Sequence, residues 1–139
     1  MGVNIYTLNK DNILGAGGFM RLRRRIAELR GGEIAEHYIA SLECFPDDIS
    51  PEHTATGEGL FNNATHEDQL LMNFLYASDV EGFIGWEAAH VILQLYEQVE
   101  NEERSDVYGY SAWEDAFTFG DFCDMLRDAV DESCPLWWH

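Results

Sequence analysis

Apolar residues recur at helical spacing through most of the chain, and this periodicity restricts it to a mainly helical fold. The clearest example is the segment 86–100, whose apolar residues form one stripe while its polar residues form the opposite one. The apolar stripe consists of Ala88, Ile92, Leu95 and Val99. The same kind of spacing predicts about five helices, which cover residues 18–30, 33–43, 66–77, 86–100 and 112–132. In the predicted helix 18–30, the arginines are expected on the faces away from that helix's own apolar stripe.

Strand-like segments stand at the two ends of the chain. VNIYT (residues 3–7) is rich in β-branched and aromatic residues, and PLWWH (135–139) is too short and too aromatic for a helix after its proline. The stretch HYIASLECF (37–45) is compatible with a strand as well as with a helix. We expect the terminal segments to pair. The predicted fold class is α+β, mainly helical, with a small sheet formed by the N- and C-terminal strands, in a single domain over residues 1–139.

The intervening segments are predicted to be turns and loops because they concentrate Gly, Pro, Asn, Asp and Ser. They are residues 9–18, 45–65, 78–85 and 101–110, and the longest of them, 45–65, is expected to be a surface loop. Thr65 and Ser111 are predicted N-caps of the helices that follow. Gly82 is expected to adopt a positive φ in a turn between two helices, and Gly120 to weaken or kink the last helix.

The chain is strongly acidic, with 26 Asp and Glu residues against 8 Lys and Arg and a net charge of -18. The charge is uneven: residues 1–30 carry six basic and two acidic residues, whereas the remainder carries 24 acidic residues and only Arg104 and Arg127. Such a field repels nucleic acid and anionic membranes and accelerates encounter with basic proteins. No apolar run of about 18 residues and no signal-like N-terminus occurs, so we expect a cytoplasmic protein.

No catalytic or cofactor motif is present in the sequence. It contains no GxSxG, no P-loop, no HExxH and no GxGxxG after a strand. Cys44, Cys123 and Cys134 are odd in number and lack CxxC spacing, so we expect reduced, mostly buried thiols. The sequence therefore predicts a protein that is not an enzyme and uses no cofactor.

Two patterns match metal sites in part. Asp79, Glu81 and Gly82 fall at EF-hand positions, but the first and twelfth positions of such a loop are both alanine, which provides no ligand oxygen. Glu87 and His90 form one half of a di-iron carboxylate motif, without a second copy, and lie on the polar stripe of their helix. Both patterns indicate solvent-exposed surface residues. The other histidines, which are His37, His53, His66 and His139, show no ligand spacing.

Two stretches of the chain resemble a known group of proteins. MGVNIY followed by GFMRLRRRIAEL, and later YASDVEGFIGWEAAHVI, are similar to small bacterial and phage proteins with an MGxxIY strand, a GFxxLRxxLA helix and an SDxxGxI turn. The resemblance covers about a third of the chain. It implies an α+β domain and transfers no activity and no functional residue.

A row of acidic residues follows one edge of the last predicted helix. Glu114, Asp121, Asp124, Asp128 and Asp131 recur at intervals of seven, three, four and three, which places charges roughly 5 to 6 Å apart along a helix edge. Phosphates along a DNA strand have comparable spacing. Together with Glu97, Glu100, Glu102, Glu103 and Asp106, these residues form the predicted partner-binding surface. Tyr108 or Tyr110 are the expected aromatic anchors.

The leading hypothesis is an acidic inhibitor that occupies a basic, nucleic-acid-binding surface of another protein. Phage DNA mimics directed against restriction or CRISPR systems and immunity proteins against nuclease toxins are the two natural settings. The expected partner is a nucleic-acid-binding protein or a nuclease, with no direct contact to nucleic acid or membrane. A monomer and a homodimer remain open. The alternatives are an accessory domain whose acidity serves only solubility, and a small metal-dependent or small-molecule enzyme.

Overall fold

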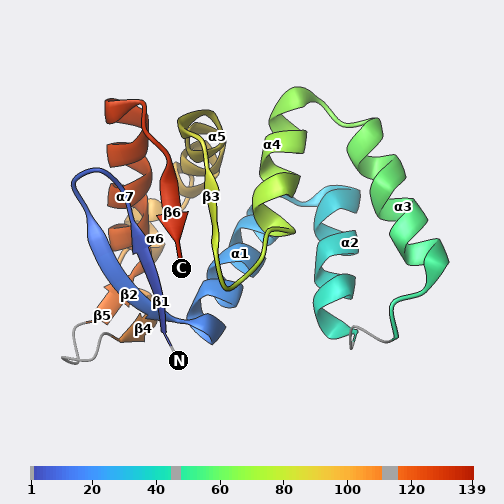
Figure 1. Ribbon diagram of the computed structural model, residues 1–139, viewed down its shortest axis with the longest axis horizontal. Helices are drawn as coiled ribbons and strands as arrows, with labels where there is room; N and C mark the ends of the chain where they lie inside the picture. Colours follow the sequence, from blue (N-terminus) through green and yellow to red (C-terminus); the bar gives the residue numbers. More distant parts are fainter. Residues whose placement is uncertain (1, 45–47, 111–115) are drawn as a thin grey trace.

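The structure, a computed structural model, describes residues 2–44, 48–110 and 116–139 (Figure 1). Within these residues the chain is a mixture of helices and small antiparallel sheets, which confirms the α+β class. The elements are β1 (Gly2–Tyr6), β2 (Asp11–Gly15), α1 (Ala16–Arg30), α2 (Gly32–Glu43), α3 (Pro51–Asn62), α4 (His66–Leu75), β3 (Gly82–Ile84), α5 (Trp86–Glu97), α6 (Glu100–Glu103), β4 (Val107–Tyr110), β5 (Ala116–Thr118), α7 (Phe119–Glu132) and β6 (Leu136–Trp138). None of the helices in this described part combines the length and the apolar character needed to cross a bilayer.

The two ends of the chain pair, as the sequence predicts. Strand β1 runs antiparallel to β6, with Ile5 opposite Trp138, and Asn4 and His139 exchange backbone hydrogen bonds of 2.7 and 2.9 Å. The sheet is larger than expected, because β2 and β3 join it in the order β2-β1-β6-β3. Figure 1 shows this sheet and α7 at one end of the molecule and α3 at the other end, beyond α2 and α4.

Strands β2 and β3 lie in segments predicted to be loop and turn, so both predictions are wrong. A turn closed by a hydrogen bond from the Thr7 N–H to the Lys10 carbonyl folds β2 back onto β1. In β3, Gly82 has no positive φ; a side chain there would place its Cβ 2.5 Å from Trp138 Cζ2. Gly82 is therefore required by the close approach of β6 and not by a turn.

Helix α3 lies inside the predicted surface loop 45–65. Ser50 caps the helix by accepting a hydrogen bond from the His53 N–H, and Pro51 occupies its first turn. No residue of α3 is buried. Its apolar contacts with the core come from Leu60 and Phe61, which are adjacent in the sequence and form no helical stripe, so the hydrophobic pattern used for prediction could not detect the helix.

The last helix begins later than predicted. Helix α7 starts at Phe119 with Thr118 as its N-cap, and Thr118 and Asp121 form a capping box. The segment before it forms β5, which pairs with β4 of the predicted polar connection. Gly120 stands in the first turn of α7, where a Cβ would lie 2.4 Å from Arg104 Cγ, so it permits close packing and does not kink the helix. The predicted cap Ser111 lies outside the described residues.

The other predicted helix ends agree more closely with the structure. Helix α1 ends at Gly31, which has a φ of 67°. The hydroxyl of Thr65 accepts a hydrogen bond from the Asp68 N–H and caps α4, as expected. In the ambiguous segment 37–45, residues 37–43 are helical as part of α2. Helix α5 ends at Glu97, and a separate short helix, α6, follows it.

One arginine of α1 is buried, contrary to the expectation that all of them lie on the faces away from the apolar stripe. The side chain of Arg23 is 2% exposed. Its Nη1 donates to the carbonyl oxygens of Phe74, Leu75 and Ala77, the last at 2.6 Å, and its Nη2 contacts Asp79 at 2.8 Å. The guanidinium also lies over the Phe19 ring, 4.6 Å from the centroid. These contacts connect α1 to the end of α4 and to the start of the β3 connection.

We expect Arg23→Met to lower the free energy of unfolding by about 3 kcal/mol, because it leaves carbonyl groups at the end of α4 without their buried donor. The matched control is Arg24→Met. Arg24 is half-exposed and reaches Glu43 only at 4.0 Å, so its loss should change stability by less than about 0.5 kcal/mol. Urea unfolding of both variants measures the difference. Equal effects of the two substitutions would contradict the role assigned to Arg23.

Candidate functional site

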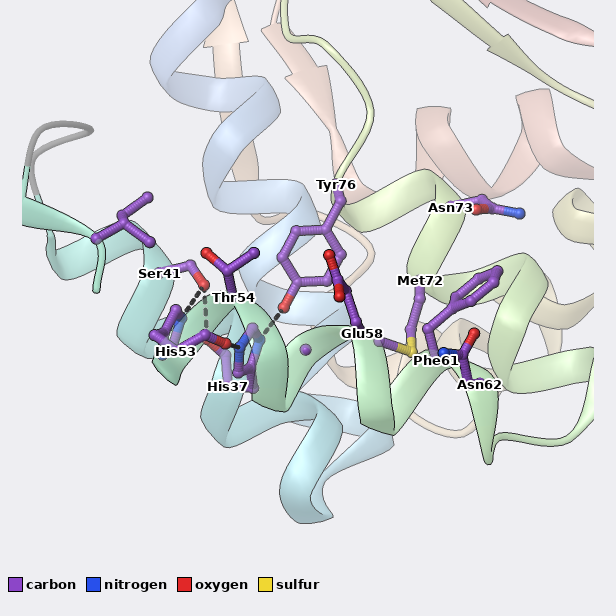
Figure 2. Close-up of a pocket in the computed structure, with 12 residues that line it drawn as sticks. His37, Ser41, His53, Thr54, Glu58, Phe61, Asn62, Met72, Asn73 and Tyr76 are labelled. Carbon is purple, nitrogen blue, oxygen red and sulfur yellow. Dashed lines mark hydrogen bonds between the residues drawn. The ribbon is translucent and has the colours of Figure 1, made fainter. Parts of the chain in front are cut away.

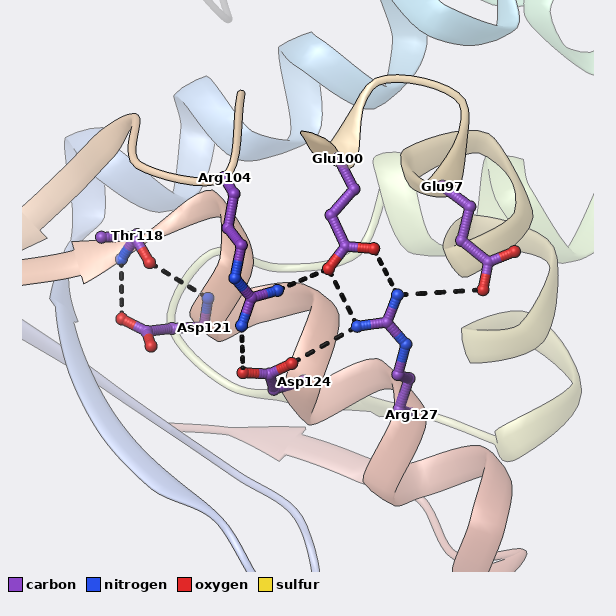
Figure 3. Close-up of polar contacts among 7 residues, drawn as sticks. All are labelled: Glu97, Glu100, Arg104, Thr118, Asp121, Asp124 and Arg127. Carbon is purple, nitrogen blue, oxygen red and sulfur yellow. Dashed lines mark hydrogen bonds and ion pairs between the residues drawn. The ribbon is translucent and has the colours of Figure 1, made fainter. Parts of the chain in front are cut away.

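The only two basic residues after residue 30 lie among the predicted interface acids. Figure 3 shows Arg104 and Arg127 between Glu100 of α6 and Asp124 of α7. Arg104 Nη2 is 3.0 Å from Asp124, and Arg127 Nη1 is 2.9 Å from Glu100 and 3.3 Å from Asp124. Glu97 is a more distant partner of Arg127 at 3.9 Å. These ion pairs hold α5, α6 and α7 together.

The electrostatic consequence is clearest at Glu100, whose side chain is largely buried. Hydrogen bonds from Arg127 are the main cause that lowers the pKa of Glu100, and Arg104 adds to the effect. The same contact raises the pKa of Arg127. Glu100 is therefore ionised in the fold and engaged by two guanidinium groups.

Three further predicted interface residues have structural partners. Asp121 accepts from the Thr118 N–H as part of the capping box of α7. Asp128 accepts from the Thr7 hydroxyl and from the Asn9 side chain, which attaches the β1–β2 turn to α7. Burial tends to raise the pKa of Asp128, but these hydrogen bonds outweigh it and the pKa is lowered. Glu103 pairs with Arg25 of α1.

The remaining residues of the predicted partner-binding surface are either exposed or outside the described part of the chain. Glu97, Glu102, Asp106 and Asp131 are exposed. Glu114 lies outside the described residues. The structure thus brings Glu97, Glu100 and Asp124 together, but around arginines. Of the α7 row, Asp121, Asp124 and Asp128 are engaged within the protein.

One of the two predicted aromatic anchors, Tyr108, is not on this surface. Tyr108 is buried, with 8% of its surface exposed, and it packs near the ring of Phe119. The prediction that Tyr108 anchors a partner is therefore wrong, because its ring belongs to the core. The side chain of Tyr110 lies outside what the structure describes.

A different set of exposed apolar side chains surrounds β3. Val80, Phe83 and Trp86 are 73%, 66% and 40% exposed. The exposed carboxylates of Glu81 and Glu87 lie between and beside them in the chain. We call these five residues the β3 surface. Sequence reasoning missed it, although apolar residues at every third position, Val80 and Phe83 in the predicted turn and Trp86 at the start of the next predicted helix, were an available signal.

Phe83 stands opposite Trp137 of β6, and Trp137 stands opposite Tyr6 of β1. The rings of Tyr6 and Trp137 stack with centroids 5.4 Å apart. Since residues on either side of them in β1 and β6 are buried, this row belongs to the outer face of the sheet. The β3 surface is therefore continuous with an aromatic row across three strands.

A pocket of about 560 Å³ lies between α2, α3 and α4. Its walls include the apolar groups of Phe61, Met72 and Tyr76, and Figure 2 shows a cluster of polar side chains at one side. Helix α3 approaches α2 closely, because a Cβ on Gly57 would lie 2.6 Å from His37 Cε1. The volume is typical of small-molecule sites.

The polar cluster consists of His37, Ser41, His53 and Tyr76. The His53 carbonyl can only accept, so His37 Nε2 donates to it at 2.7 Å, and in that tautomer Nδ1 of His37 accepts from the Tyr76 hydroxyl at 2.6 Å. Ser41 donates to the His37 carbonyl at 2.8 Å, so His53 Nε2 donates to Ser41 Oγ at 2.7 Å. The two imidazole rings stack with centroids 3.8 Å apart. Histidines that showed no common spacing in the sequence thus form one network.

The burial of Tyr76 raises the pKa of its hydroxyl, which therefore remains a donor to His37. Ser41 and His53 have the separation of a nucleophile and its base. Ser41 lies in the interior of α2, however, where the backbone N–H groups make helix hydrogen bonds and offer no oxyanion donors. The arrangement supports ligand binding better than acyl transfer.

The partial metal motifs have other roles. Asp79 is bound by the guanidinium of Arg23, and Glu87 and His90 are both exposed on α5. Across residues 2–44, 48–110 and 116–139, no three His, Cys, Asp or Glu side chains gather closely enough to hold a metal ion.

The cysteines are free, but only Cys123 is buried, and burial raises its pKa to about 12. Cys44 is exposed and Cys134 is half-buried, so the expectation of mostly buried thiols is wrong.

Comparison with models of protein families, with curated proteins and with solved structures returned no match for this chain.

We expect Glu100→Gln to lower the free energy of unfolding by about 2 kcal/mol at neutral pH. The pKa of Glu100 is lowered in the fold from its ordinary value of 4.5. Its ion pairs therefore stabilise the protein above the unfolded-state pKa, and this stabilisation disappears as the pH falls through the folded-state pKa. The difference from the wild type should accordingly shrink in urea unfolding experiments from about pH 7 to about pH 3.

Glu102→Gln is the control for this prediction, because Glu102 belongs to the same helix α6 but is exposed. It should change stability little at any pH in the series. A constant effect of Glu100→Gln across the series would show that the ion pairs are not its cause.

Proposed function

We propose that this protein is a non-enzymatic acidic inhibitor that occupies a basic, nucleic-acid-binding surface of another protein. The observation that carries the proposal is the use of its cations. Six of the seven arginines contact carboxylates within the fold. Most of the positive charge is therefore held in ion pairs within the fold, while many carboxylates remain exposed in a chain of net charge -18. Such a protein meets basic surfaces rapidly and is repelled by nucleic acid.

Between the two settings, the structure supports an immunity-type inhibitor better than a phosphate mimic. A mimic of a DNA strand requires a regular series of free carboxylates. In α7, Asp121, Asp124 and Asp128 are engaged by partners within the protein. The exposed acids Glu97, Glu102 and Asp106 remain candidates for contacts with a partner's Lys and Arg residues.

The β3 surface is the best candidate for the centre of the interface. Tight interfaces combine a few well-packed aromatic anchors with charged contacts around them. Phe83 and Trp86 provide exposed rings, and Glu81 and Glu87 provide carboxylates beside them. We therefore expect a partner surface with an apolar depression bordered by arginine or lysine.

The test is affinity capture from the source cell at about 0.05 M and about 0.5 M salt, followed by a DNA-displacement assay on the purified captured protein. The expected partner binds DNA, is released by heparin or high salt, and loses DNA binding or nuclease activity when this protein is added. A captured protein that keeps its DNA in the presence of a molar excess of the inhibitor would refute the proposal.

Phe83→Ser should weaken the captured complex by more than tenfold, since a buried aromatic anchor is typically worth about 2 kcal/mol or more. Leu8→Ser is the matched control, because Leu8 is also an exposed large apolar residue but lies outside the β3 surface. It should leave the affinity unchanged. Calorimetric titration of the purified pair measures the affinity of both variants. Equal losses of affinity would show that the interface is not centred on the β3 surface, and would leave the proposed function itself untouched.

A further inference from the structure

The pocket between α2, α3 and α4 has a distinct chemical character. The described residues that line it include no lysine or arginine, and the single ionisable carboxylate among them is Glu58 of α3. An anionic ligand would therefore meet no countercharge, and the net charge of -18 would oppose its approach. A cationic ligand would find both a local carboxylate and a favourable field.

The polar cluster of the pocket favours the same sign of charge, whereas the other polar lining residues, Thr54, Asn62 and Asn73, offer donors and acceptors alike. The His37 Nε2–H, the Tyr76 hydroxyl and the Ser41 hydroxyl all donate within the polar cluster. Because these donors are already used, the polar cluster can only accept hydrogen bonds from a ligand, at lone pairs of the Tyr76 oxygen and at Nδ1 of His53. A protonated amine supplies the donors that such acceptors require.

The opposite side of the pocket accommodates an apolar group. Figure 2 shows Phe61 and Met72 on the side away from the His–Ser pair, with Glu58 labelled between the two sides. The ring of Tyr76 provides an additional aromatic face for a cation. Methionine and phenylalanine together form an adaptable apolar wall.

We propose that this pocket binds small organic cations, in which a protonated amine is attached to an apolar, preferably aromatic body. The ammonium group contacts Glu58 and the acceptors of Tyr76 and His53, and the apolar body lies against Phe61 and Met72. The site is separate from the β3 surface, and the proposal does not depend on the inhibitor function.

The experiment compares three probes that share an indole ring: tryptamine, tryptophol and indole-3-propionate. They are titrated into the full chain by calorimetry and by ¹⁵N-resolved NMR. Tryptamine should bind saturably, tryptophol at least about tenfold more weakly because it lacks the charge-assisted hydrogen bond, and indole-3-propionate should show no saturable binding. The amide shifts caused by tryptamine should map to α2, α3 and the end of α4.

Two variants separate local contact from the general acidic field. Glu58→Gln should reduce the affinity for tryptamine about tenfold and leave that for tryptophol unchanged. Glu52→Gln removes the same charge from an exposed position of the same helix outside the pocket, and should change neither. Equal binding of the three probes, no saturable binding of tryptamine, shifts centred outside these helices, or equal losses in the two variants would each overturn the proposal.

Discussion

The buried guanidinium of Arg23 is the contact on which the arrangement of the elements depends. It satisfies carbonyl groups where α4 ends and contacts Asp79 just before β3. From the other side, the indole Nε1 of Trp138 donates to the Ser78 carbonyl at 2.8 Å. The connection between α4 and β3 is thus held by the first helix and by the last strand. Because β6 also pairs with β1, these contacts join the middle of the chain to both of its ends. Arg23 of the GFxxLRxxLA pattern and Asp79 and Gly82 of the SDxxGxI pattern thus have clear structural roles here.

Sequence reasoning predicted the elements that bury an apolar stripe and missed those that do not. Helices α1, α4 and α5 each have a buried face, and their periodicity was sufficient to predict them. Helix α3 buries no residue, and its only local signal was the Ser50-Pro51 start. Strands β2 and β3 are defined by pairing with distant segments, which a local pattern does not contain. The same limit applies to the pocket, since His37 and His53 become neighbours only through the packing of α3 on α2.

The acidic character of the chain was evident from its composition, but the function of individual carboxylates was not. Arg25 joins α1 to Glu103 of α6, and Arg30 joins α1 to Asp68 of α4 with contacts of 2.7 and 2.9 Å. In both cases the hydrogen bond to the partner is the main cause that raises the pKa of the arginine. These pairs connect elements far apart in the sequence, and their partly buried positions make them less sensitive to salt than isolated surface pairs. The few cations of the protein therefore act mainly as internal connections.

Internal hydrogen bonds and ion pairs determine which carboxylates of α7 remain free for other contacts. Along α7, Asp121 caps its own helix, Asp124 is bound between two guanidinium groups, and Asp128 accepts from the β1–β2 turn. Helical periodicity placed all three on one edge correctly, yet their partners come from β5, α6 and the N-terminal turn. A regular row of acids is thus insufficient to identify a binding surface, because the same row can be required for folding. By contrast, the apolar rings of Phe83 and Trp86 are exposed. On a surface that is otherwise strongly charged, this exposure is costly unless a partner covers the two rings. For this reason the proposed interface is centred on the exposed aromatic residues and not on the carboxylates of α7.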